Sequence, residues 1–383
     1  MEKIETQSKD REMLFSVLKA GMGWGANPVE VPGDMLPDLL RLAKRQSILP
    51  IAFRGICWDH VPEPIRQAVE ADCSKSVFYF LQQSEALRCV SAVLESAAIP
   101  YVPLKGAVLR SLYREEWLRT SSDLDVLVHP EDLDAAIALL TENAGFCKKK
   151  QSDHDVSMLN QYVHLELHFR LSGDMSIPLL DEVWQHSRKT EGSFRYEMDT
   201  DYLIFYVLAH MSRHLKAEGL GIRAYLDLFL LLHKTEFDES KLLGMCKESR
   251  LLRFYEASKN LTEVWFGEET HTAISSELEK VVLSGGVFGS AETTVFARQR
   301  QIAQNTRSSL NYFQRRLFLP AEEMRLRYPE LESKPWLLPY LYGKRICHGL
   351  KDKRQSIQDE MMITRQQKQE SVQFSHLLDE LGL

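Results

Sequence analysis

Two aspartates stand two residues apart in an apolar segment in the first half of the chain. They are Asp123 and Asp125, in the sequence Asp-Leu-Asp-Val-Leu-Val. Because successive side chains of a β-strand point to opposite faces, both carboxylates project to one side, while Leu124 and Val126 face the core. Carboxylates held this close repel each other unless a cation lies between them. A hard divalent ion such as Mg²⁺, which also brings phosphates, serves that purpose, so the pair is typical of a nucleotidyl-transfer site.

The segment before the two aspartates contains the elements that would position them. Residues 101–104 form a short apolar run bounded by Pro100 and Gly106, which predicts a buried strand. A helical pattern follows over 107–113, and the strand with the aspartates covers 123–129. Gly106 would let the backbone approach a triphosphate closely, with amides at the start of the helix donating to its oxygens.

A third carboxylate is expected from a neighbouring strand. Apolar and polar residues alternate over 162–171, so Glu166 and His168 share the polar face. Glu166 could hold a metal ion and accept a proton, or it could face solvent and pair with Arg170. His168 could hydrogen-bond Glu166 or contact a nucleotide, or it could have only a structural role.

These segments resemble the core of the polymerase-beta-type nucleotidyltransferase superfamily, and more closely a bacterial group of uncharacterised nucleotidyltransferase-like proteins. The resemblance covers roughly residues 100–345 and is specific only in its first 25 residues. The matching residues are Leu104-Lys105-Gly106, Tyr113, Arg119, Asp123-Leu124-Asp125, Glu166-Leu167-His168, His214, Arg223, Asp227, Arg316-Leu317-Phe318 and Tyr328-Pro329.

The resemblance implies a two-metal site that uses Mg²⁺, or alternatively Mn²⁺, to stabilise the attacking and leaving oxygens. It assigns catalysis and metal binding to Asp123, Asp125 and Glu166. It assigns nucleotide binding to a second set of residues, which are Lys105, Gly106, Arg119, His168, His214, Arg223 and Asp227.

Three features leave alternatives open. Many members of the superfamily have a serine after the glycine, where this chain has Ala107, and Lys105 could supply the missing grip on phosphate or point outward. Arg119 could pair with phosphate or fix Asp123, since arginine suits both anions. His210 and His214 lie one helical turn apart, a spacing that can bind zinc but that favours nucleotide contacts or domain packing here.

Composition limits the class of protein. The chain has 383 residues, 44% hydrophobic and 26% charged, as in a globular protein, and its net charge of −7 argues against a nucleic-acid substrate. No apolar run is long enough to span a membrane, and the N-terminus lacks a signal-peptide core. The six cysteines form no CxxC pair, which indicates reduced thiols and a cytoplasmic protein.

The patterns predict an α+β fold, in which a small mixed-sheet nucleotidyltransferase palm domain is flanked by helical domains. Residues 1–98 form the N-terminal helical region, 99–198 the nucleotidyltransferase core and 199–383 the C-terminal helical domain. A long helix over 64–98 leads into the core, where 146–159 and 162–171 are each expected to form one strand.

The leading functional hypothesis is an enzyme that moves a nucleoside monophosphate, AMP from ATP above all, to a hydroxyl group. The acceptor would be a small molecule or a protein side chain, and the acidic balance slightly favours a cationic acceptor. The alternative is a noncatalytic relative that binds a nucleotide or a partner protein, which Ala107 favours. The third hypothesis is a mainly helical scaffold in which the α/β segment is only structural.

Overall fold

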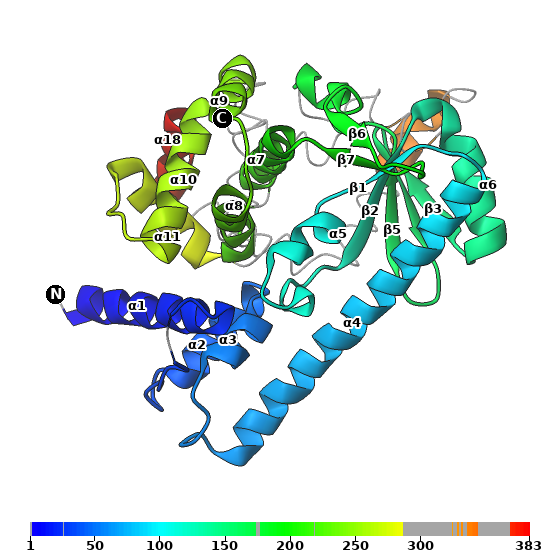
Figure 1. Ribbon diagram of the computed structural model, residues 1–383. Coiled ribbons are helices and arrows are strands. Elements are labelled where there is room, and N and C mark those ends of the chain that lie inside the picture. The colour runs from blue at the N-terminus through cyan, green and yellow to red at the C-terminus, as the bar shows by residue number, and fades with distance from the viewer. Residues whose placement is uncertain are drawn as a thin grey trace.

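The computed structural model describes residues 2–25, 27–173, 177–217, 219–285 and 368–383, together with 324, 328, 331 and 335–343. A mixed sheet and many helices make up the fold, so the predicted α+β class is confirmed (Figure 1). The predicted division at residues 98 and 198 stays a prediction.

The main sheet has five strands in the order β1-β2-β5-β4-β3. The strands β2 and β5 pair in parallel, and the other neighbours are antiparallel. This arrangement places the two strands with acidic side chains next to each other, although they are far apart in the sequence. The bounds are β1 Tyr101–Pro103, β2 Asp123–Val128, β3 Cys147–Gln151, β4 Asp155–Leu159 and β5 His164–His168.

The prediction of a single strand over 146–159 is wrong, because the segment folds into the hairpin of β3 and β4. The hydroxyl of Ser152 accepts hydrogen bonds from the backbone N–H groups of His154 and Asp155, at 3.3 and 3.1 Å. A serine that takes up backbone donors in this way stabilises a turn and competes with the extended ladder.

Two helices cover one face of the sheet, α4 (Glu63–Ser96) and α6 (Leu133–Ala144) (Figure 1). The predicted long helix and the predicted stop at Gly145, which has a φ of 68°, are confirmed. Apolar side chains of the strands meet those of the two helices in one core. Its members include Val90, Leu94, Leu124, Val126, Ala136, Leu140, Leu165 and Leu167.

The other helices form a second, larger core in which the N-terminal and C-terminal helical segments pack together. The ring of Phe15 from α1 stacks on that of Trp265 from α10, with centroids 4.8 Å apart. The helices concerned are α1 Glu2–Met22, α2 Leu36–Arg45, α3 Leu49–Gly55, α7 Thr200–Ala217, α8 Ile222–Lys234, α9 Glu239–Glu248, α10 Leu252–Phe266, α11 Ala273–Ser284 and α18 Lys368–Glu380.

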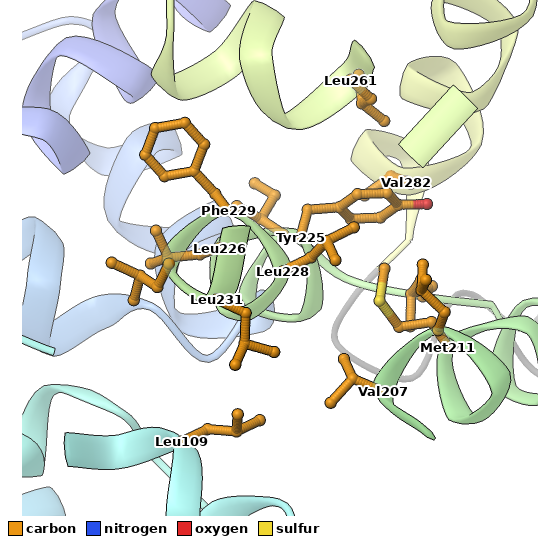
Figure 2. Close-up of a cluster of buried hydrophobic side chains, with 14 of the residues drawn as sticks. Leu109, Val207, Met211, Tyr225, Leu226, Leu228, Phe229, Leu231, Leu261 and Val282 are labelled. Atoms are coloured by element: carbon orange, nitrogen blue, oxygen red, sulfur yellow. The ribbon is translucent and has the colours of Figure 1, made fainter. Parts of the chain in front are cut away.

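Helix α8 lies at the centre of this core. It contacts α7, α10 and the short 3-10 turn Arg110–Leu112 that follows α5 (Gly106–Leu109). Figure 2 shows its apolar side chains surrounded by Leu109, Val207 and Met211 on one side and by Leu261 and Val282 on another. The helix therefore links the segment just after Gly106 to the C-terminal helices.

Among the described residues, no helix is long and apolar enough to cross a membrane. The cysteines of the described part, Cys57, Cys73, Cys89, Cys147 and Cys246, are all free.

Glycines allow α1 and α3 to cross at backbone contact. A side-chain carbon at Gly55 would collide with the carbonyl oxygen of Val17, and one at Gly21 with that of Ile51. We expect Gly55→Ala to lower the free energy of unfolding by about 1–3 kcal/mol, because backbone atoms must move apart. Chemical denaturation measures the change.

The matched control is Gly244→Ala in α9, an exposed position where an added carbon meets nothing. It should raise the free energy of unfolding by about 0.5–1 kcal/mol, since alanine is the better helix former. Equal effects of the two substitutions would contradict the close crossing of α1 and α3.

Candidate active site

The sheet register brings the predicted carboxylates together. In the parallel ladder of β2 and β5, Asp125 pairs with Glu166 and Asp123 with His164. The side chains of Asp123, Asp125 and Glu166 all line one cavity of about 250 Å³, on the face of the sheet opposite α4 and α6. The predicted adjacency of the two strands is thus confirmed, while the catalytic roles of these residues stay a prediction.

Asp125 is the most buried of the three carboxylates, with 2% of its side chain exposed. The ammonium group of Lys105 lies 2.9 Å from its Oδ1, and Nε2 of His168 lies 3.0 Å from the same oxygen. Burial alone would raise the pKa of Asp125, but the Lys105 charge and the His168 hydrogen bond hold that pKa below its usual range. The carboxylate is therefore kept ionised inside the protein.

The other two carboxylates have different surroundings. The ring of His168, whose Nε2 lies 3.6 Å from Oε2 of Glu166, lowers the pKa of Glu166 against the effect of burial. Burial, and after it the charge of Asp125, raises the pKa of Asp123. The hydroxyl of Ser121 donates to Oδ1 of Asp123 at 3.2 Å. Asp123 is consequently the carboxylate with the least compensation by positive charge.

Lys105 faces the site from a strained backbone. Its φ of 37° is unusual for a residue with a side chain, and strain of this kind persists only where the surroundings fix it. The next residue, Gly106, packs tightly, because a side-chain carbon there would lie 2.9 Å from Oγ of Ser121 and 3.0 Å from a guanidinium nitrogen of Arg119. The structure thus resolves the open orientation of Lys105, which points to Asp125 rather than outward.

The opposite wall of the cavity comes from α7 and α8 and carries basic side chains. It includes His210, Arg213 and His214 of α7 and Arg223 of α8. The Nε2 atoms of the two histidines lie 3.1 Å apart. Burial, followed by the positive charges nearby, lowers the pKa of His210 and brings that of His214 to about 4, so both are neutral at pH 7.

A buried ion pair ties the loop before β2 to α8. The Nε and Nη2 atoms of Arg119 each donate to the carboxylate of Asp227 at 2.8 Å, and the hydroxyl of Tyr113 donates to Oδ1 at 2.8 Å. Arg223 donates to the carbonyl of Thr120 at 2.6 Å. Of the two roles considered for Arg119, the structure shows a carboxylate partner, and this partner is Asp227 rather than Asp123.

The structure places every residue of the predicted site but one in the cavity wall. Lys105, Gly106, Arg119, Asp123, Asp125, Glu166, His214, Arg223 and Asp227 line it, and His168 contacts two of its carboxylates. Ser121, Ser122 and Arg213 also line the cavity, and no sequence pattern indicates them. His210 lines it too, and its helical spacing from His214 puts both on one wall.

The comparisons with known proteins give the family. The sequence matches the family described as "Uncharacterised nucleotidyltransferase" over residues 34–267, which is more than half of the chain. The chain belongs to this family. The match begins and ends earlier than the resemblance over 100–345, so Arg316-Leu317-Phe318 and Tyr328-Pro329 lie beyond it. Of these last residues, only Tyr328 is among the described ones.

Two solved structures are similar to parts of this chain. One is the antibiotic-resistance factor ANT(2'')-Ia, with 12% identity, a TM-score of 0.34, and coverage of 47% of this chain and 93% of that chain. The other is an antigenic nucleotidyltransferase-like protein from Paracoccidioides brasiliensis, with 15% identity, a TM-score of 0.34, and coverage of 51% and 94%. No match was found among curated proteins.

The buried ion pair gives a stability prediction. We expect Asp227→Leu to lower the free energy of unfolding by about 3–5 kcal/mol, because it leaves the guanidinium of Arg119 buried without its counter-ion. The double variant Arg119→Met/Asp227→Leu should recover much of that loss, since no charge is then left unpaired. Urea denaturation measures all three proteins.

An exposed pair provides the control. Nζ of Lys280 lies 2.6 Å from Oε1 of Glu277, and more than half of each side chain is exposed. Glu277→Leu should change the free energy of unfolding by less than about 1 kcal/mol. If the double variant were as unstable as Asp227→Leu, the loss would not come from the unpaired charge of Arg119.

Proposed function

We propose that the protein is a metal-dependent nucleotidyltransferase that moves AMP from ATP to a hydroxyl of a small molecule or a protein. The observation that carries the proposal is the register of β2 and β5. It sets Asp125 beside Glu166, and Asp123 two residues earlier on the same face, at the wall of a cavity lined opposite by basic groups. Membership of a nucleotidyltransferase family supports the same reaction class.

The acidic wall suits divalent cations. Oxygen and nitrogen atoms of Asp125, Glu166 and His168 lie within 4.8 Å of one another, which is close enough to share one ion. Asp123 and Asp125 would hold a second ion at the phosphates, with Mg²⁺ or Mn²⁺ as the candidates. Bound cations of this kind neutralise the developing charge on the attacking and leaving oxygens. Glu166, which also lines the cavity, would take the proton of the acceptor hydroxyl.

The basic wall suits the phosphate end of the nucleotide. The cavity of about 250 Å³ is smaller than the range of about 300–1,000 Å³ common for drug-sized ligands, so it would take the triphosphate rather than the whole nucleotide. Arg223 and the neutral His214, which line the same cavity as the carboxylates, would orient it. In the reaction a bond forms between the acceptor oxygen and the α-phosphorus, the bond to pyrophosphate breaks, and pyrophosphate leaves with the electron pair.

A noncatalytic relative that binds a nucleotide or a partner protein is the second candidate. Two observations favour it: Ala107 stands where many superfamily members have a phosphate-binding serine, and the ammonium of Lys105 already contacts Asp125. The same fold would then hold a ligand without transferring it. The leading proposal includes a cytoplasmic location and a bacterial source. It does not include a nucleic-acid substrate.

Calorimetric titration of ATP, with and without Mg²⁺, tests the leading proposal. We expect Mg²⁺-dependent binding to the wild type and none to Asp123→Asn/Asp125→Asn, because the double variant loses two cation ligands. Pyrophosphate release in the presence of a panel of sugars, cationic antibiotics and protein acceptors should fall about a hundredfold or more in the variant.

The matched control is Asp134→Asn, the same change at an exposed position of α6. It should bind ATP as the wild type does. Mg²⁺-dependent binding without pyrophosphate release from any acceptor would favour the noncatalytic candidate. Equal ATP binding by the wild type and the double variant would contradict the proposed site. So would a wild type that binds none of the common nucleoside triphosphates.

A further inference from the structure

His168 occupies a position from which its ring nitrogen reaches both of the neighbouring carboxylates. It ends β5 two residues after Glu166, on the same face, and 6% of its side chain is exposed. Its Nε2 lies 3.0 Å from Oδ1 of Asp125 and 3.6 Å from Oε2 of Glu166. One ring nitrogen is therefore directed at both carboxylates.

These separations of 3.0 and 3.6 Å fall within the range between adjacent and opposite ligands of a single ion. In a six-coordinate site with bonds of about 2.1 Å, adjacent ligand atoms are about 3.0 Å apart and opposite ones about 4.2 Å. The three ligand atoms of Asp125, Glu166 and His168 lie within 4.8 Å of one another. A cation can therefore contact all three with only small side-chain movements, once the ammonium of Lys105 leaves Oδ1 of Asp125.

We propose that His168 is a direct ligand of the metal ion at Asp125 and Glu166, and that it makes this site prefer transition-metal ions to Mg²⁺. Mg²⁺ favours oxygen ligands and gives up its water reluctantly. An imidazole nitrogen strengthens the binding of transition-metal ions instead, and increasingly so along the series from Mn²⁺. The inference rests on the proposed function, because it concerns the same metal site, but its readout does not require turnover.

Mn²⁺ added to the full-length protein is the probe. Pulsed electron paramagnetic resonance of the bound ion should show coupling to a ¹⁴N nucleus in the wild type and none in His168→Gln. We further expect the variant to bind Mn²⁺ at least about tenfold more weakly, by loss of the free-ion signal on titration. Its affinity for Mg²⁺, measured by competition, should fall much less, so the preference for Mn²⁺ shrinks.

His164→Gln is the matched control. His164 lies on the same strand and the same face, but its Nε2 is 2.7 Å from the hydroxyl of Ser157 and it does not line the cavity. The control should keep both the ¹⁴N coupling and the Mn²⁺ affinity of the wild type.

The possible failures can be told apart. Bound Mn²⁺ without ¹⁴N coupling in the wild type overturns the ligand role of His168 and leaves the proposed function standing. This result needs no variant, so it stays decisive even if His168→Gln does not fold. Coupling that persists in a folded His168→Gln also overturns the inference. No Mn²⁺ binding by the wild type would overturn both the inference and the metal site of the proposed function.

Discussion

Three carboxylates that repel one another lie on one face of the sheet. The pairing of β2 with β5 brings Asp123, Asp125 and Glu166 together in a largely buried place. Ionised carboxylates are unfavourable there unless positive charge lies close to them. Lys105 and His168 reduce the repulsion, because both contact the same oxygen of Asp125. Asp123 receives less compensation, and under the proposed function a bound cation would supply it.

The helical segments complete the site rather than merely surround it. Arg119 and Tyr113 come from the loop before β2, and both donate to Asp227 of α8. The same helix contributes Arg223 to the cavity and packs its apolar side chains into the larger core. Movement of α8 would therefore move both the loop that leads to Asp123 and the basic wall. The packing of α8 is thus coupled to the loop that leads to Asp123.

The sequence predicted what local periodicity controls. Alternation along a strand was sufficient to place Asp123 and Asp125 on one face and Glu166 on the polar face of another strand. Contacts between distant segments were out of its reach: no local pattern joins Arg119 to Asp227, 108 residues away. The prediction of a single strand over 146–159 was wrong for another reason. The hydroxyl of Ser152 accepts backbone hydrogen bonds in competition with the strand ladder.

A crystal structure with a nonhydrolysable ATP analogue and Mn²⁺ would show whether the carboxylates of β2 and β5 hold metal ions at a bound triphosphate. Anomalous scattering locates each Mn²⁺ ion without reference to the protein density. We expect a peak in contact with Asp125 and Glu166, the triphosphate between this wall and Arg223, and the ammonium of Lys105 displaced from Asp125. A nucleotide bound elsewhere, or an intact contact between Lys105 and Asp125 with no anomalous peak beside it, would show that these carboxylates do not form the metal site.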